Sequence, residues 1–476
     1  MCYNCFMDIE KRARRQSRRI IISEVLMVLT VIATVSILAF IVSGYWVSPD
    51  FKIERQGLLQ IYSTPTGADV EVDGNPSSWL QRTNTSKTLT AGEHTIKLTK
   101  EGYDTWSRTI NITEGLLYRL HYPRLFLTNR TEETIGEYSA NFATVSPDRN
   151  TLLLGNNTTS WQLINLDTEN IKPIDIDLSK ILPFSSLAEG ASTGLFSGAV
   201  ESADWAADNE HLLLKIKQDT TANWLIINVK NPGSSVNLTK EFNADFQEIK
   251  ILNQSASDLL ATTSNNLHRI DASSKQISAI LVPDVIYFDY YDQDVVFSAK
   301  DQSAEASTPY YIGLIRLGSD EIKTLKTTTS MDRPVITKFY EDNYIGVVDD
   351  NSIKLYTKND FAEKNAFPLS FKPDYIKIGM AGEAIIMYSG GHIITLDMEA
   401  MEIFDWSTGT DKFGWLDSSM IYAAKDGALN VYDFNGLNHR ILSSNVSSHF
   451  PVTITADKYL YYFRDGSLIR EYLFER

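Results

Sequence analysis

Residues 421–432 read IYAAKDGALNVY. Two apolar segments flank the turn Lys425-Asp426-Gly427, and a turn of this composition between apolar runs is typical of a β-hairpin. The same arrangement occurs at residues 345–356, 385–396 and 460–470, with intervals of 40, 36 and 39 residues from turn to turn. Because about 40 residues is the repeat length of a four-stranded propeller blade, the sequence predicts a β-propeller.

We count eight such units between residues 128 and 476, which begin near residues 138, 199, 246, 284, 334, 372, 411 and 447. A ring of seven blades is the alternative, if residues 170–200 hide a degenerate unit. The last unit ends at Arg476 without room for a fourth strand. We therefore expect Leu125-Phe126-Leu127 to supply that strand and close the ring, because closure removes exposed strand edges.

Acidic turns precede several of these hairpins. Asp148, Asp208, Asp417 and Asp457 each follow one strand and begin the next, and an Asp in such a turn accepts hydrogen bonds from backbone amides two residues on. The units resemble the blades of Tol-system and peptidase-associated propellers, in which a Trp-Ser-Pro-Asp-Gly element precedes an apolar strand. The resemblance, carried by Ser146-Pro147-Asp148, implies the architecture and transfers no functional residue.

A second β unit is predicted upstream, at residues 57–116. It contains alternating strands, an Asp73-Gly74 hairpin turn and Trp106, which we expect to fill the core of a small β-sandwich. The segments TPTGADVEVDG (64–74), AGEHTI (91–96) and KEGYDTW (100–106) occur in the order found in the PEGA domain, and the unit resembles that family. The resemblance implies a surface-exposed, non-catalytic β module of prokaryotic envelope proteins, without a defined ligand.

Residues 25–47 read VLMVLTVIATVSILAFIVSGYWV and carry no charge. As a helix they would extend roughly 34 Å, enough to cross the hydrocarbon core of a bilayer. Threonine and serine hydroxyls in the segment can bond back to a carbonyl one turn earlier. Residues 1–24 form a basic leader with six Lys and Arg residues, so the positive-inside rule predicts a cytoplasmic N-terminus and an extracytoplasmic remainder. A cleaved signal peptide is the alternative.

Charge and cysteine content fit a single-pass signal-anchor protein with an exported bulk. Cys2 and Cys5 are the two cysteines of the sequence, and both lie in the leader. Residues beyond 24 carry 38 basic and 57 acidic side chains, a net charge of −19. Since phosphate binding requires positive charge, this composition excludes a nucleic-acid partner.

Candidate sites are few. The Gly- and Ser-rich stretch at 182–198 is either a binding loop, with Phe184, Leu195 and Phe196 as the candidate contact residues, or an unstructured connection between two blades. Asp289, Asp292 and Asp294 form the densest acidic cluster and are weak candidates for a hard cation, but a solvated turn between strands is the favoured explanation. The sequence contains neither a His-Glu-x-x-His motif nor a Gly-x-Ser-x-Gly elbow.

We therefore expect no cofactor and no enzymatic activity. The sequence favours a mainly β cell-surface protein, held by one transmembrane helix, which displays the PEGA-like module and the propeller for binding a protein or a glycan in the cell envelope. The alternative is an extracytoplasmic hydrolase or sensor that uses acidic residues at the central channel of the propeller. A hydrolase of glycans would need two carboxylates about 5–10 Å apart.

Overall fold

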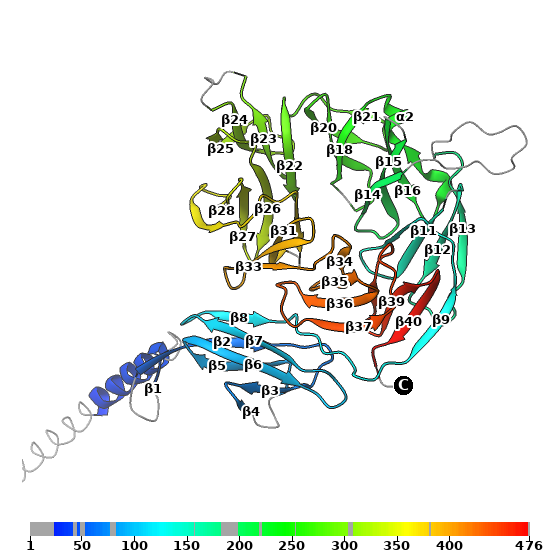
Figure 1. The fold of residues 1–476 in the computed structure, drawn as a ribbon. Coiled ribbons are helices and arrows are strands. Elements are labelled where there is room, and N and C mark those ends of the chain that lie inside the picture. The colour runs from blue at the N-terminus through cyan, green and yellow to red at the C-terminus, as the bar shows by residue number, and fades with distance from the viewer. Residues whose placement is uncertain are drawn as a thin grey trace, which may run out of the picture. The chain divides into compact units, whose positions relative to one another are not determined.

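The computed structural model describes residues 23–40, 45–47, 53–76, 82–156, 158–181, 199–218, 221–252, 254–302, 308–379 and 382–474. The chain divides into two compact units, Met1–Leu125 and Phe126–Arg476 (Figure 1). The predicted boundary near residue 128 lies close to this division.

The first described element is a helix, Ser23–Phe40, which has a mean hydropathy of 2.2 and no buried residue. Its length and composition suit either a membrane span or a signal sequence. Thr30 and Thr34 each donate a hydroxyl hydrogen bond of 2.8 Å to the carbonyl four residues earlier, as predicted. The predicted extension of this helix to Val47 is wrong: Tyr45–Val47 pair with Ile53–Arg55 as β-strands, so their backbone hydrogen bonds are made between strands.

The first unit contains two small sheets. Its strands are β1 (Tyr45–Val47), β2 (Ile53–Ile61), β3 (Asp69–Val72), β4 (Asn75–Pro76), β5 (Thr85–Thr90), β6 (Gly92–Thr99), β7 (Trp106–Ile112) and β8 (Leu117–Leu120). One sheet has the order β1-β2-β5 with β8 paired to β2, and the other has the order β4-β3-β6-β7. β8 runs parallel to β2, so this unit extends beyond the predicted limit at residue 116.

The core of the first unit is centred on Trp106, which is completely buried as predicted. The alternating burial of β7 places Trp106, Arg108, Ile110 and Ile112 on one face. The Arg108 guanidinium is buried against the ring of Tyr122, 5.7 Å from the ring centre. A buried arginine is stable here because the aromatic face and a hydrogen bond to the Tyr122 hydroxyl replace water.

The second unit is a propeller of eight four-stranded blades among its described residues, which confirms the larger of the two predicted numbers (Figure 1). The first four blades are β10 (Phe142–Val145), β11 (Thr151–Gly155), β12 (Ser160–Asn165) and β13 (Pro173–Asp177); β14 (Ala199–Trp205), β15 (His211–Gln218), β16 (Thr221–Asn228) and β17 (Val236–Asn237); β18 (Phe246–Ile251), β19 (Asp258–Thr263), β20 (Asn266–Asp271) and β21 (Gln276–Ile277); β22 (Val285–Tyr291), β23 (Asp294–Lys300), β24 (Tyr310–Arg316) and β25 (Ile322–Thr328).

The other four blades are β26 (Arg333–Phe339), β27 (Asp342–Val348), β28 (Ser352–Thr357) and β29 (Glu363–Pro368); β30 (Tyr375–Gly379), β31 (Ala384–Ser389), β32 (His392–Asp397) and β33 (Glu402–Ser407); β34 (Phe413–Trp415), β35 (Met420–Lys425), β36 (Ala428–Asp433) and β37 (Arg440–Ser444); β38 (Thr453–Thr455), β39 (Tyr459–Arg464), β40 (Ser467–Tyr472) and β9 (Glu132–Glu137). A 3₁₀ turn (Pro232–Ser234) and a short helix α2 (Leu238–Phe242) precede and follow β17.

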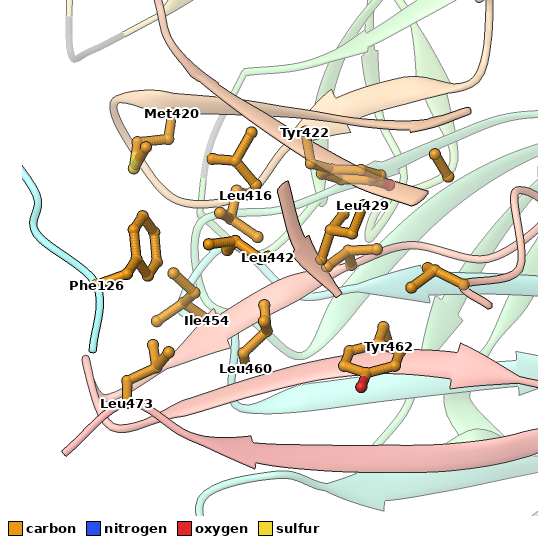
Figure 2. Close-up of a cluster of buried hydrophobic side chains, with 14 of the residues drawn as sticks. Phe126, Leu416, Met420, Tyr422, Leu429, Leu442, Ile454, Leu460, Tyr462 and Leu473 are labelled. Carbon is orange, nitrogen blue, oxygen red and sulfur yellow. The ribbon is translucent and has the colours of Figure 1, made fainter. Parts of the chain in front are cut away.

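Strand β9 closes the ring by pairing with β40, for example Gly136 with Leu468. The prediction that Leu125-Phe126-Leu127 closes it is therefore wrong by several residues. Phe126 instead inserts its ring into a cluster of buried side chains from the last two blades (Figure 2). Burial of this apolar side chain in the core is more favourable than its placement on an outer strand, because an outer strand faces water on one side.

The acidic turns behave as predicted at three positions. Asp148 accepts a hydrogen bond from the amide of Asn150, Asp208 from those of Glu210 and His211, and Asp417 from those of Ser419 and Met420. These bonds satisfy amides that the strand ladder leaves free, and they fix the start of the following strand.

Candidate binding channel

The innermost strands of five blades surround a pair of connected cavities. The larger, of about 980 Å³, is lined by β18, β22, β26 and β30. The second, of about 860 Å³, is lined by strands of the second and third blades, and it shares Glu248, Lys250, Tyr290 and Tyr375 with the first. We call the polar centre of these cavities the channel site; it consists of Asp204, Glu248, Lys250, Asp289, Tyr375 and Lys377.

Lys250 and Asp289 form the fixed part of the channel site. The Lys250 ammonium lies 3.0 Å from Asp289 Oδ1 and 5.3 Å from the centre of the Phe288 ring. The amide of Ile336 on the next blade donates to Asp289 Oδ2 at 3.1 Å. Burial lowers the pKa of Lys250, but the carboxylates of Asp289 and Glu248 outweigh it and leave that pKa above its ordinary value.

Asp204 and Lys377 form the open part of the site. They lie on β14 and β30, and among the described residues neither has an ion-pair or hydrogen-bond partner. Burial raises the pKa of Asp204, while the charges of Lys377 and Lys250 oppose that rise. Burial also raises the pKa of Glu248. The two carboxyl groups therefore hold a proton more readily than surface carboxyl groups do.

An aromatic surface borders these charges. The Tyr375 side chain is 60% exposed and stacks on Tyr388, with ring centres 5.0 Å apart and planes inclined by 17°. Phe413 packs edge-on against the ring of Tyr388, with ring centres 5.1 Å apart. Stacking on a supported ring fixes the orientation of Tyr375 and leaves one of its faces open to the channel.

Arg333 fixes the neighbouring rim. Its guanidinium stacks over Tyr287 at 4.6 Å and donates a hydrogen bond to the carbonyl of Asp374, next to Tyr375. The wall beside the aromatic surface is therefore held by contacts between the fourth, fifth and sixth blades.

Of the predicted acidic cluster, only Asp289 belongs to the channel site. Asp292 is exposed in the turn after β22, and Asp294 is buried in an ion pair with Lys358. Among the described residues, no group of three or more His, Cys, Asp or Glu side chains is arranged to hold a metal ion. Phe184, Leu195 and Phe196 lie outside the described residues.

The sequence did not identify the other five residues of the channel site, which are Asp204, Glu248, Lys250, Tyr375 and Lys377. The available signal was charge on strands that should face the centre of the ring, such as Glu201 and Asp204 on β14 and Lys377 on β30. That signal identifies the inner strands but does not reveal which blades approach one another across the channel.

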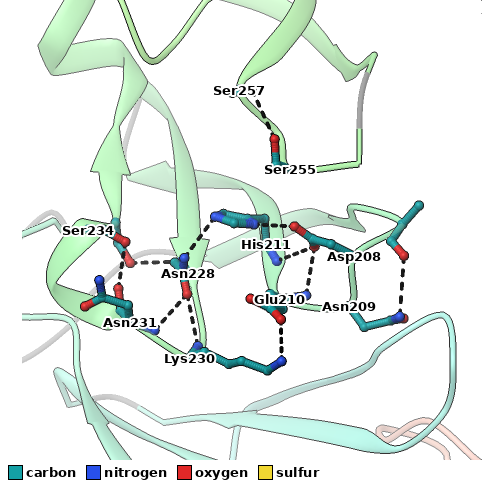
Figure 3. Close-up of polar contacts among 12 residues, drawn as sticks. Asp208, Asn209, Glu210, His211, Asn228, Lys230, Asn231, Ser234, Ser255 and Ser257 are labelled. Atoms are coloured by element: carbon teal, nitrogen blue, oxygen red, sulfur yellow. Dashed lines mark hydrogen bonds and ion pairs between the residues drawn. The ribbon is translucent and has the colours of Figure 1, made fainter.

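A second polar cluster surrounds His211 (Figure 3). His211 Nδ1 lies 2.6 Å from Asp208 Oδ2, and its Nε2 lies 2.9 Å from the side-chain nitrogen of Asn228. Hydrogen bonds from the amides of Glu210 and His211 and from the His211 ring outweigh burial and lower the pKa of Asp208. Both ring nitrogens of His211 are occupied by neighbours, so this cluster fastens two strands of the second blade.

Comparisons with known proteins agree with this division of the chain. Residues 56–124 match the PEGA domain family. The first unit therefore contains a PEGA domain. No curated protein matches the sequence.

Two solved propellers illustrate the structural similarity. The C-terminal WD40 domain of Sif2 has 11% identity and a TM-score of 0.47, covering 73% of this chain and 99% of that domain. The oligogalacturonate lyase of Vibrio parahaemolyticus has 12% identity and a TM-score of 0.40, covering 62% of this chain and 98% of the lyase.

Proposed function

We propose that this protein is a membrane-anchored surface protein whose propeller binds a glycan at the channel site without catalysis. The observation that carries the proposal is the exposed face of Tyr375, which stacks on Tyr388 beside Asp204 and Lys377, two charges without an ion-pair partner among the described residues. Sugar rings present apolar C–H faces together with hydroxyl groups. An aromatic face with nearby donors and acceptors matches both parts of such a ligand.

The unpaired charges explain why a hydroxyl-rich ligand suits the site better than an apolar one. An apolar ligand would remove water from Asp204 and Lys377 without replacing its hydrogen bonds, which costs free energy. Hydroxyl groups donate to a carboxylate and accept from an ammonium, so a glycan can satisfy both groups at once.

The anchor rests on the helix Ser23–Phe40 and the basic leader before it. From Val25 onward this helix carries no charge, and a helix satisfies its own backbone hydrogen bonds within lipid. The six basic residues of the leader favour a cytoplasmic N-terminus, which places the PEGA domain and the propeller outside. Replacing Leu29, Ile32 and Leu38 together with arginine should release the chain from membranes, and retention of that variant in the membrane pellet would contradict a single anchor.

Binding is tested with the full chain in detergent and soluble cell-wall oligosaccharides from neutral, N-acetylated and uronic-acid classes. We expect saturable binding of one class, measured by calorimetry, that Tyr375→Ala weakens. Tyr340→Ala is the matched control, because Tyr340 is also exposed and packed on an aromatic ring (Phe339) but lies outside the channel site. Equal loss of binding in both variants would contradict the assignment of the site.

Hydrolysis is the second candidate, favoured by the raised pKa of Asp204 and Glu248. A raised pKa shifts a carboxyl group toward the protonated form that a general acid requires. Chromatography of the same oligosaccharides after incubation with the protein distinguishes the two functions. Intact sugars support binding without catalysis. Shortened products that the wild type forms and Asp204→Asn does not form would overturn non-catalytic binding.

A further inference from the structure

The PEGA domain exposes a group of apolar side chains on one sheet. Leu58, Leu116, Leu117 and Tyr62 are 41%, 61%, 38% and 37% exposed. Leu58 pairs with Leu117 across β2 and β8, while the neighbours Leu59 and Tyr118 are buried on the other side. Because side chains alternate along a strand, Leu58, Tyr62 and Leu117 belong to the outward side of this sheet. Leu116 lies in the turn before β8, where its carbonyl accepts a hydrogen bond from the Leu58 amide, and its exposed side chain adjoins that side. We call these four residues the β2 outer face.

Strand pairing places this face beside the point at which the chain leaves the N-terminal helix. Residues 58–61 of β2 pair with β5 on one edge, so β8 occupies the opposite edge, which it shares with β1. Tyr45 of β1 pairs with Arg55, three residues from Leu58 and therefore about 10 Å away along the strand.

Chain length then limits the distance from the face to the anchor. The helix ends at Phe40 and β1 begins at Tyr45, so at most about 18 Å of extended chain joins them. Leu58 and Leu117 consequently remain within about 33 Å of the end of the helix in any arrangement of the linker. A short tether of this kind keeps the PEGA domain at the surface of the bilayer that holds the helix.

The charge of the face also suits a bilayer. The outward side of the sheet carries no carboxylate among its described side chains. Its positions are Gln56, Leu58, Gln60 and Tyr62 on β2, Ser86, Thr88 and Thr90 on β5, and Leu117 and Arg119 on β8. This is unusual in a chain with a net charge of −16. Arg119 is the charged residue of that group, and its sign attracts anionic headgroups.

We propose that the β2 outer face lies on the outer surface of the membrane, with Leu58, Leu116 and Leu117 inserted at the level of the headgroups. The proposal rests on the anchor of the proposed function and does not depend on the glycan site. Shallow insertion of leucines beside a cation is how peripheral surfaces bind bilayers. Docking would fix the height and orientation of the PEGA domain above the membrane.

The test uses the full chain in vesicles of phosphatidylethanolamine and phosphatidylglycerol. Cys2 and Cys5 are replaced by serine, and Leu116→Cys carries an environment-sensitive fluorophore. Asn111→Cys is the matched control, because Asn111 is exposed on β7 of the other sheet. Vesicles with and without a lipid that bears a quencher near its headgroup show whether lipid itself touches the label.

We expect the label at position 116 to emit at shorter wavelength and to lose intensity with the quencher lipid, while the label at position 111 does neither. A shift without lipid quenching means that a second copy or another part of the chain covers the face, and it overturns the proposal. If neither effect occurs while the chain resists alkaline extraction, the result overturns the docking of the β2 outer face and leaves the anchor in place. If alkaline extraction removes the chain from the vesicles, the result contradicts both the anchor and the docking.

Discussion

The propeller gathers charge in two places, and the two differ in how the charges are paired. In the closing blade, Arg130 contacts Glu471, Arg464 contacts Glu132 and Arg470 contacts Glu133, at 2.8, 2.9 and 2.8 Å. In the channel site, Lys250 and Asp289 are paired, but Asp204 and Lys377 have no direct partner among the described residues.

This difference separates charges that hold the fold from charges that are available to a ligand. Glu132 and Glu133 lie on β9 and are joined to arginines at the end of the chain, so their ion pairs link residues more than 300 positions apart. Removal of one partner there affects closure of the ring. Asp204 and Lys377 take no part in these ion pairs, and under the proposed function they exchange water for a polar ligand.

Arg130→Met should have the largest effect on stability. The Arg130 and Glu471 side chains are only 12% and 7% exposed, and Arg130 also donates to the carbonyls of Leu127 and Leu442. Losing the arginine leaves a buried carboxylate without its cation, which costs about 3 kcal/mol. Chemical denaturation of the propeller measures this loss.

The double variant Arg130→Met with Glu471→Gln is the control. It removes the uncompensated charge, so part of the stability should return. If the double variant is no more stable than Arg130→Met, the ion pair is not the cause of the loss.

Lys250→Met should destabilise the propeller by less, about 2 kcal/mol. Asp289 keeps its hydrogen bond from the amide of Ile336 and remains partly solvated in the channel. Lys372→Met is the comparison, because Lys372 and its partner Asp350 are both well exposed and such a pair contributes little. Equal unfolding midpoints for these two variants would contradict a structural role for Lys250.

Tyr375→Ala should change binding and leave stability almost unaltered. The exposed ring contributes little to the core, whereas loss of a stacking surface should weaken the bound oligosaccharide about tenfold. Calorimetric titration gives the affinity and thermal unfolding gives the stability. A large fall in Tm would instead place Tyr375 among the residues that hold the fold.

Asp204→Asn should have the smallest effect, and the effect should depend on pH. Because burial raises the pKa of Asp204 in the folded state, the folded protein binds the proton more tightly than the unfolded chain does. Ionisation of Asp204 therefore destabilises the fold above its ordinary pKa of about 4. The variant should unfold at a slightly higher temperature than the wild type at neutral pH, and this difference should disappear in acid. A constant difference from acid to neutral pH would contradict the raised pKa.

Much of the fold follows from local patterns. The predicted starts of the blades lie within a few residues of the innermost strands, for example 199 and 246 at β14 and β18 and 411 near β34. Hairpin turns and alternating apolar residues are local signals, and each acts over fewer than about ten residues. The burial of Trp106 follows from the same alternation.

Errors occurred where one segment had two plausible uses. Tyr45–Val47 is apolar enough to continue the helix, and only its pairing with Ile53–Arg55 makes it a strand. Residues 125–127 are apolar and correctly positioned for a fourth strand, yet β9 makes the pairing because its glutamates meet Arg464 and Arg470. The energies that decide such cases come from partners distant in the sequence.

The sequence by itself determined the apolar N-terminal segment, the PEGA domain and the propeller repeat, with eight blades favoured over seven, because periodicity and turn chemistry are carried by neighbouring residues. Only the tertiary structure decided that β9 closes the ring and that Asp204, Tyr375 and Lys377 line two adjoining cavities. Those side chains come from blades separated by more than 160 residues. Their meeting depends on ring closure and on the packing between blades, which no local pattern encodes.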